Sequence, residues 1–159
     1  MALILRQATD DEIESLIPIL VLADNSVAAI RWSLENLSDT VYAAENDGKT
    51  VAAVSVKWNS DPCEIVELAV AEEFQRRGIG KFLVEMLVAE ARKKGKEKLL
   101  VGTANSSIGN ITFYQRCGFR MDHIRRDYFR YLKTPEFEYG IEVKDMIVFS
   151  LDLKVAQTI

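Results

Sequence analysis

The sequence predicts an α/β fold in which a mixed central sheet of about six or seven strands is flanked by about four helices. One observation is Asp47-Gly48 between two strand-like segments, which is a strong signal for an antiparallel hairpin. A second is a glycine-rich turn at residues 75–81, which joins a buried strand to an amphipathic helix. The third is the strand–helix alternation after this turn, which is typical of crossover connections. The 159 residues are expected to form one domain, residues 1–159.

The N-terminal segment is predicted to form one strand and two helices. Residues 3–7 have the character of a short strand. Thr9 and Glu12 form a capping box, and apolar residues follow it at helical spacing. Pro18 falls within this spacing, so we expect it to bend or shorten the helix. A second helix is predicted over residues 25–37.

Strand-forming residues dominate the middle of the chain. The hairpin strands are predicted over residues 40–45 and 50–58, and the next strand, 64–70, is mostly apolar and therefore central. An apolar stripe predicts a helix over residues 79–94, which Gly95 ends. The later predicted elements are a strand over 98–103, a helix over 110–116, and strands over 119–126 and 144–153. A long aromatic and acidic connection separates the last two strands.

Charge and hydropathy argue against membrane and nucleic-acid-binding classes. The longest apolar stretch is residues 16–23, which contains Pro18, whereas a membrane-spanning helix needs about 20 apolar residues. The N-terminus lacks the basic and apolar regions of a signal peptide, so we expect a cytoplasmic protein. The formal net charge of −4 disfavours a nucleic-acid partner, because such proteins usually have a basic face.

Cysteine and histidine residues are too few to predict a metal site. Cys63, Cys117 and the single histidine, His123, cannot complete a four-ligand zinc site without carboxylates. Both thiols are expected to be free, at least partly buried and without a catalytic role. His123 alternates with Phe119 and Met121 along a predicted strand, so we expect it to pack against that face or to act as a reserve base.

The glycine-rich turn carries the clearest functional signal. It consists of Gln75, Arg76, Arg77, Gly78, Ile79, Gly80 and Lys81. Its glycines allow backbone N–H groups to converge at a helix N-terminus, where the helix dipole and the basic side chains favour a phosphate or pyrophosphate. Leu83 breaks the dinucleotide fingerprint, and Phe82 replaces the Ser or Thr of a P-loop. The alternative is a tight strand–helix turn whose arginines are solvated.

A wider segment resembles a known family. Residues 64–95 resemble the signature of the GNAT superfamily of acyl-CoA N-acyltransferases, whose loop pattern (Q/R)-x-x-G-x-(G/A) is matched by Gln75, Gly78 and Gly80. The family also carries an Asn and an aromatic pair before Gly-Phe, matched here by Asn110, Phe113, Tyr114, Gly118 and Phe119. The resemblance covers about residues 40–125 and implies a GNAT-like fold. The segment 137–153 resembles the closing strand of small bacterial members.

The resemblance implies an N-acetyltransferase that moves an acetyl group from acetyl-CoA to a primary amine by direct attack in a ternary complex. The resemblance then implies that the backbone of Leu68, Ala69 and Val70 pairs with the pantetheine arm as a neighbouring strand would. It also implies that an N–H near Val70 donates a hydrogen bond to the thioester carbonyl oxygen. The pyrophosphate falls on residues 76–81, with side-chain help from Arg76 and Lys81 rather than Arg77. The alternative is that these strand residues are simply part of the core. Both interpretations are compatible, because the side chains can pack in the core while the backbone binds the cofactor.

The family places two further residues on the next helix. Tyr114 occupies the position that protonates the leaving thiolate, for which a phenol with a pKa of about 10 is suited. Alternatively it is a core aromatic residue beside Phe113. Asn110 resembles the cofactor-contacting Asn of the family, but it also suits a helix start. Asn105 is an alternative for either role.

The general base is expected to be a carboxylate on the strand before the turn. Glu64 and Glu67 are three residues apart, so strand alternation predicts that they point to opposite faces and only one faces the acyl site. We favour Glu67, because it lies closer to the thioester end. Burial would have to raise its pKa for catalysis near neutral pH. The alternative is that both glutamates are structural.

The acceptor is predicted to be the amine of a small molecule or peptide. In the family the acceptor pocket lies between the first two helices and the late strand connection, where acidic and aromatic residues suit an ammonium group. The candidates are Asp24, Asn25, Trp32, Asp127, Tyr128, Tyr131, Glu136 and Glu138. A catalytically silent acyl-CoA-binding module is the alternative function. A homodimer through the late strands would be common for the family.

Overall fold

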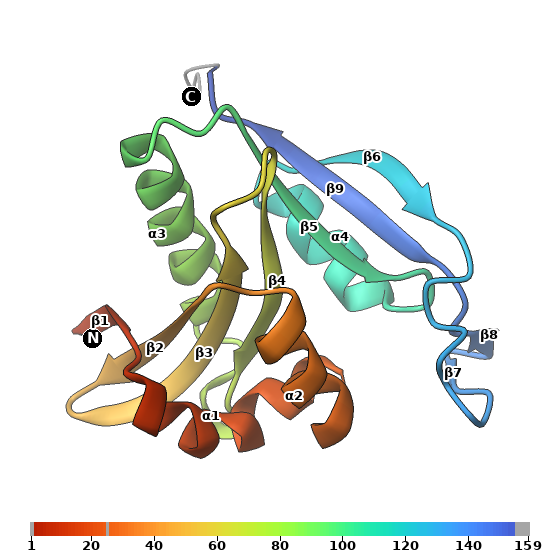
Figure 1. Ribbon diagram of the computed structural model, residues 1–159, viewed down its shortest axis with the longest axis horizontal. Helices are drawn as coiled ribbons and strands as arrows, with labels where there is room; N and C mark the ends of the chain where they lie inside the picture. The colour runs from red at the N-terminus through yellow and green to blue at the C-terminus, as the bar shows by residue number, and fades with distance from the viewer. Residues whose placement is uncertain (1, 25, 155–159) are drawn as a thin grey trace.

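The computed structural model describes residues 2–24 and 26–154 and contains a seven-stranded mixed sheet (Figure 1). The strand order is β1-β2-β3-β4-β5-β9-β6, and β4 and β5 form the parallel pair. The strands are β1 (Leu3–Gln7), β2 (Thr40–Asn46), β3 (Lys49–Lys57), β4 (Cys63–Val70), β5 (Lys98–Ala104), β6 (Arg120–Arg125) and β9 (Met146–Asp152). The helices are α1 (Ile13–Leu20), α2 (Val27–Asn36), α3 (Ile79–Lys93) and α4 (Ile108–Arg116). The predicted α/β class and mixed sheet are confirmed.

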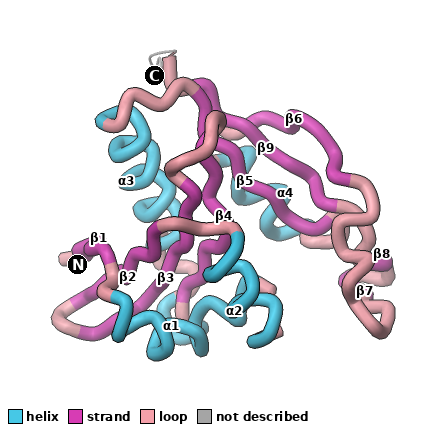
Figure 2. The backbone as a smooth tube through the Cα atoms, viewed as in Figure 1, coloured by secondary structure: helices cyan, strands magenta, loops and turns pink. Residues whose placement is uncertain are grey.

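Helices cover both faces of the sheet, as Figure 2 shows, and each face has its own apolar core. On one face, α3 inserts Leu83 and Leu87 against the central strands and Phe149 of β9. On the other face, α1 and α2 bury Leu20 and Ile30 against the N-terminal strands. The second core is smaller and lies over β2 and β3, and no helix of the described residues covers that face of the later strands.

Local signals explain the N-terminal elements. The capping box of Thr9 and Glu12 is present, and Glu12 also accepts hydrogen bonds from Arg6 of β1. Pro18 lies inside α1, which ends two residues later and continues as a 3-10 turn over Val21–Ala23. The expected shortening is therefore observed. α2 begins after Ser26, whose side chain accepts a hydrogen bond from the backbone of Ala29.

The two parallel strands separate along their length. β4 pairs with β5 only over Cys63–Ile65, and the remaining residues of β4 continue to Val70 without a β5 partner. Figure 1 shows the two strands diverging toward the end of the sheet where α3 begins. The backbone of 66–70 on this side is therefore free to hydrogen bond with something other than a neighbouring strand.

A β-bulge in β4 corrects one prediction about Glu64 and Glu67. Ser55 pairs with Glu67 and Val56 pairs with Ile65, so Val66 is an extra residue in β4. Cys63 and Ile65 before the bulge and Leu68 and Val70 after it pack into the same core. Glu64 and Glu67 consequently share the opposite face, and the prediction that they point to opposite faces is wrong.

The late connection between β6 and β9 contains a structure that the sequence did not suggest. A short hairpin of β7 (Phe137–Glu138) and β8 (Ile141–Glu142) projects from the molecule beyond the end of the main sheet (Figure 1). On β6, His123 is exposed rather than packed, because β6 is an edge strand whose side chains are exposed or half-exposed on both faces. Cys63 is buried and Cys117 half-buried, and both are free as expected.

Within the described residues, no single helix is long and apolar enough to cross a membrane. The segments Asp10–Ala23 and Val27–Asn36 satisfy that test only as a pair, and the pair is bent by 114° at the break between them.

Candidate active site

The turn between β4 and α3 presents backbone N–H groups at a helix N-terminus. Gly78 immediately precedes α3 and has φ +81°, a left-handed conformation that glycine adopts without strain. Arg76 is also left-handed, with φ +63°. The side-chain amide of Gln75 donates a 2.9 Å hydrogen bond to the carbonyl of Val70, so it braces the turn against the end of β4. This arrangement suits an anion, because backbone N–H groups and the positive end of the helix dipole coincide.

Exposed basic side chains surround the turn, namely those of Arg76, Arg77 and Lys81. Ile79, by contrast, is buried in the core, so only its backbone is available to a ligand. At Gly80 a Cβ atom would lie 3.2 Å from the ring of Phe113. The absence of a side chain at Gly80 therefore lets the start of α3 approach α4 closely, next to the unpaired part of β4.

Tyr114 projects from α4 into the main core. Its ring contacts Phe113 and Phe119 edge-on, with centroids 5.1 and 5.8 Å apart, and it lies 6.1 Å from Phe149. Burial raises the pKa of the Tyr114 hydroxyl. Like an ordinary phenol, Tyr114 is therefore protonated at neutral pH and has a proton to donate. The structure places Tyr114 in an aromatic cluster, as the alternative reading expected, and this position is compatible with the acid role.

The two asparagines near α4 have different surroundings. The side chain of Asn110 is on the exposed first turn of α4 and donates to the hydroxyl of Thr103 at 3.3 Å. Asn105 uses its side chain to bind the late connection: it donates to the carbonyl of Glu142 and accepts from the N–H groups of Lys144 and Asp145. Asn105 is thus occupied structurally, which leaves Asn110 as the asparagine available to a ligand.

Glu67 is a buried carboxylate held by two hydroxyl groups. It is 8% exposed. Ser33 of α2 donates to Oε2 at 2.7 Å, and Ser55 of β3 donates to Oε1 at 2.8 Å. Burial raises the pKa of Glu67, and the nearby charges of Asp24 and Glu64 raise it further. These are the conditions under which a glutamate can exchange a proton near neutral pH.

Glu64 has a cationic partner, unlike Glu67. Arg125 of β6 reaches across β9 and β5 and places Nη2 2.6 Å from Oε1 of Glu64. Its other nitrogen lies 3.6 Å from the sulfur of Met146, and Met146 fills the space that a side chain at Gly102 would occupy. The ion pair therefore lies across the uncovered face of β5 and gives Glu64 a charged hydrogen-bond partner.

Four of the predicted acceptor residues gather in front of Glu67. The hydroxyl of Tyr131 donates to Oδ1 of Asp24 at 3.4 Å. Burial raises the pKa of Asp24 to about 6, and the charge of Glu136 contributes to the rise. Burial also raises the pKa of Tyr128, on which Glu64, Glu67 and Asp24 act in the same direction. The junction after α1 and the connection after β6 thus meet over the face that carries Glu67.

Comparison with known proteins identifies the family to which this chain belongs. Residues 8–119 match the acetyltransferase (GNAT) family. The chain belongs to the GNAT acetyltransferase family. Membership confirms the resemblance of the sequence motifs, and it makes the chain an acetyl-CoA-dependent acetyltransferase.

Three relatives of this GNAT chain are informative. An uncharacterized N-acetyltransferase of Bacillus subtilis (strain 168) is 37% identical over 150 residues, which is 94% of each chain. The structure of a GNAT family acetyltransferase from Elizabethkingia anophelis with acetyl-CoA bound is 32% identical, has a TM-score of 0.83, and is matched over 94% of this chain and 97% of its own. The [ribosomal protein bS18]-alanine N-acetyltransferase of Escherichia coli (strain K12) is 31% identical over 88 residues, 55% of this chain and 60% of the relative.

The other predicted acceptor residues of this GNAT chain lie elsewhere or are occupied. Trp32 is 58% exposed on α2. Glu138 of the β7–β8 hairpin accepts hydrogen bonds of 3.1 Å from Ser106 and Ser107, just before α4. Asp127 is in a turn, where its N–H donates to the side chain of Asp145. Asn25 is outside the described residues.

Three functional candidates escaped the sequence reading. Ser33 and Ser55 hold Glu67, and Arg125 pairs with Glu64. Ser55 was detectable as the polar residue within the apolar run of β3, since a buried hydroxyl needs a partner. Ser33 and Arg125 gave no comparable signal, because a serine in a helix and an arginine on an edge strand are ordinary surface residues.

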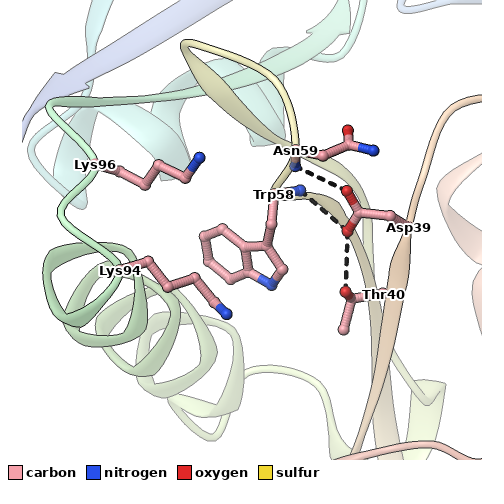
Figure 3. A pocket seen from close by; sticks show the side chains of 6 residues that line it. All are labelled: Asp39, Thr40, Trp58, Asn59, Lys94 and Lys96. Carbon is pink, nitrogen blue, oxygen red and sulfur yellow. Dashed lines mark hydrogen bonds between the residues drawn. The ribbon is translucent and has the colours of Figure 1, made fainter.

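A hollow of about 440 Å³ lies at the other end of the sheet and is separate from the GNAT site (Figure 3). It is lined by Asp39, Thr40, Trp58, Asn59, Lys94 and Lys96. Asp39 accepts hydrogen bonds from the backbone N–H groups of Trp58 and Asn59, and the Lys94 ammonium lies 5.5 Å from the Trp58 ring centroid. These contacts join the start of β2 to the end of β3 and have no link to the phosphate-type turn.

Proposed function

We propose that this GNAT chain transfers an acetyl group from acetyl-CoA to a primary amine by direct attack in a ternary complex. The observation that carries the proposal is the separation of β4 from β5 beside the turn at 75–81. It leaves the backbone of 66–70 available along one edge, directly before the anion-binding N-terminus of α3. An elongated ligand that has a peptide-like arm and a pyrophosphate fits this sequence of features.

The donor is held mainly by backbone groups. Pantetheine amides pair with the backbone of Leu68, Ala69 and Val70, while the N–H groups of residues 76–81 bind the pyrophosphate. An N–H near Val70 donates to the thioester oxygen as negative charge develops on it, which lowers the barrier. Arg76 and Lys81 add charge at the exposed side of the turn, and Asn110 contacts the donor from α4.

Glu67 is the base in this proposal, and Glu64 is not. The ammonium of the acceptor must lose a proton before its nitrogen can attack. Glu64 is neutralised by Arg125, whereas no cation of residues 2–24 or 26–154 forms an ion pair with Glu67. The two serine hydroxyls fix the Glu67 carboxylate, and its raised pKa brings it closer to that of the reacting amine.

Tyr114 supplies the proton that the departing thiolate needs. A phenol, with a pKa of about 10, is already protonated at neutral pH, and burial raises the pKa of Tyr114 further. The Tyr114 ring packs against that of Phe113, with centroids 5.1 Å apart, and a Cβ atom at Gly80 of α3 would lie 3.2 Å from the Phe113 ring. These contacts support a position of Tyr114 near the start of α3. The acceptor amine then approaches from the opposite side, between Asp24 and the connection after β6.

The test is acetylation of an amine panel with detection of free CoA thiol, together with calorimetric binding of acetyl-CoA. The panel contains amino acids, polyamines, amino sugars and peptides with a free N-terminus, since one relative is an alanine N-acetyltransferase of a ribosomal protein. We expect turnover, a loss of about 100-fold or more in kcat for Glu67→Gln and Tyr114→Phe, and unchanged acetyl-CoA affinity. Binding of acetyl-CoA without turnover of any amine would favour the silent binding module.

A homodimer is a further part of the proposal. β6 is an edge strand of the sheet and exposes Met121 (59%) and Ile124 (52%), so its outer edge can pair with a second copy. Light scattering after size exclusion tests this, with Ile124→Lys expected to give a monomer. A monomeric wild-type chain at micromolar concentration contradicts it.

A further inference from the structure

Asp24 is a second carboxylate near Glu67. It is half-buried at the end of the 3-10 turn after α1, where backbone geometry changes to φ −140°. The Tyr131 hydroxyl, from the connection after β6, donates a hydrogen bond of 3.4 Å to its Oδ1 atom. Asp24 and Glu67 are close enough that the charge of Asp24 raises the pKa of Glu67. The two carboxylates thus lie near each other, with Glu67 the more deeply buried of the two.

The charge of this region is not balanced by the protein itself. Among the described residues, Asp24, Glu67 and Glu136 form no ion pair, and the nearby Arg125 is committed to Glu64. Glu136 raises the pKa of Asp24, and Asp24 in turn raises that of Glu67, as expected for like charges in partly buried positions. A ligand with two positive charges would relieve this repulsion, whereas a carboxylate on the ligand would add to it.

Aromatic side chains border the same approach. Tyr128, Phe129 and Tyr131 follow one another with ring centroids 5.2 and 6.1 Å apart. Tyr128 is half-buried near both Glu67 and Asp24, whose charges raise the pKa of its hydroxyl. Tyrosine faces attract ammonium groups, and they offer an apolar surface to the methylene chain that joins two of them.

We propose that Asp24, together with Tyr131, selects acceptors that carry a second ammonium group, so that diamines and polyamines are preferred over free amino acids. The distal ammonium binds Asp24 while the reacting amine faces Glu67. Asp24 is a specificity-determining residue in this scheme and takes no part in the proton transfer. The inference rests on the proposed function, because it concerns the acceptor of that reaction.

A matched set of four-carbon amines tests the proposal. Butane-1,4-diamine, butan-1-amine and 4-aminobutanoate differ at the far end only, which is positive, neutral and negative respectively. We expect kcat/KM to fall in that order. Asp24→Asn should reduce the diamine-to-monoamine ratio about tenfold, mainly through KM, because one charge-assisted contact is lost. Tyr131→Phe should reduce the ratio by a smaller factor.

The control removes an equal charge from the neighbouring helix. Glu35 is exposed on α2, and Glu35→Gln should leave the three kcat/KM values and their order unchanged. A ratio that Asp24→Asn does not alter, or a preference for 4-aminobutanoate, would overturn the selection by Asp24 while leaving acetyl transfer intact.

A binding measurement separates this inference from the proposed function. If none of the amines is acetylated, the proposed transfer fails, and calorimetry of the CoA-loaded protein still decides the question about Asp24. Tighter binding of butane-1,4-diamine than of butan-1-amine, lost in Asp24→Asn, supports the selection. Equal binding of the two amines contradicts it.

Discussion

At the scale of single residues, the site depends on how each carboxylate is partnered. Glu64 faces a guanidinium, Glu67 two hydroxyls and Asp24 one phenol, although all three share one region. A guanidinium stabilises the charged form strongly, a hydroxyl does so weakly, and burial opposes it. The same functional group can therefore serve as a fixed charge, an exchanger of protons or a recognition element.

The serine partners of Glu67 give the first residue-scale prediction. Ser33 lowers the pKa of Glu67, so Ser33→Ala should raise it and move the acidic limb of the kcat/KM profile to higher pH. Ser55→Ala should act in the same direction. Each variant should also lose about 1–3 kcal/mol of unfolding free energy, because a buried acceptor loses its donor. Ser60→Ala, whose hydroxyl binds the Pro62 carbonyl away from the site, should leave the pH profile unmoved.

Asp24 gives a prediction about stability. Its pKa is raised from 3.8 to about 6 in the folded chain, so the folded state binds a proton that the unfolded state has lost between these pH values. Stability from this group is fully present below the unfolded pKa and is lost as pH rises through about 6. Asp24→Asn should therefore raise the free energy of unfolding at pH 7.5 more than at pH 4. Urea unfolding at both pH values measures this, and an equal gain at the two values would contradict it.

At the scale of elements, the β4 strand and the turn after it determine what the site can bind. The bulge at Val66 brings Glu64 and Glu67 to one face, and the turn then reverses the chain into α3. Both features concern the backbone, and both fall within eleven residues of Gln75. A substitution that strains the backbone of this strand or turn should therefore weaken ligand binding more than a substitution that only removes a side chain.

A pair of glycine substitutions tests this at the two helix starts. Gly78 has open space around it but φ +81°, so Gly78→Ala should cost about 1–2 kcal/mol of unfolding free energy and weaken acetyl-CoA binding. Gly109 also has open space and is helical, so Gly109→Ala should leave stability unchanged or raise it by up to about 1 kcal/mol. Thermal unfolding and calorimetry provide the two readouts. Equal effects of the two substitutions would refute the role of the left-handed turn.

Element positions were largely predictable from local sequence, and the exceptions have physical causes. The hairpin at Asp47-Gly48 and the helix ended by Gly95 follow from turn and capping residues that act within a few positions. The bulge at Val66 depends instead on pairing with β3, and the β7–β8 hairpin on contacts between Glu138 and the start of α4. Such long-range contacts leave no local pattern, so strand alternation misplaced Glu64. His123 is exposed for another reason, because β6 is an edge strand with exposed side chains on both faces.

At the scale of the whole molecule, the site lies between two halves of the sheet, where β4 and β5 separate from each other. β1 to β4 form one half and β5, β9 and β6 the other, with three registered residue pairs between β4 and β5. The motif residues of the turn come from the first half and Tyr114 from the second. Sequence reading could identify these members through their family pattern, whereas the Ser33, Ser55 and Arg125 contacts required the assembled halves.

Hydrogen exchange should detect this division. Amides of 66–70 that face away from β3 have no strand partner on the β5 side, so they should exchange faster than those of β5, which pairs along its whole length with β9. Saturating acetyl-CoA should slow exchange in 66–70 and in 76–81, and it should leave β5 residues 98–104 nearly unchanged. Equal protection of all three segments by acetyl-CoA would contradict binding along β4.

The hydrogen bond from Gln75 to Val70 has a mechanical consequence. It ties the residue that begins the turn to the carbonyl that ends the strand, so the six-residue segment 70–75 is closed into a ring. The proposed thioester site near Val70 and the proposed pyrophosphate site at residues 76–81 are thereby held at a fixed distance from each other. A donor whose pantetheine arm is shorter or longer than this distance could occupy one of the two sites but not both. The hydrogen bond between Gln75 and Val70 would therefore make the enzyme selective for the length of its thioester donor as well as for its charge.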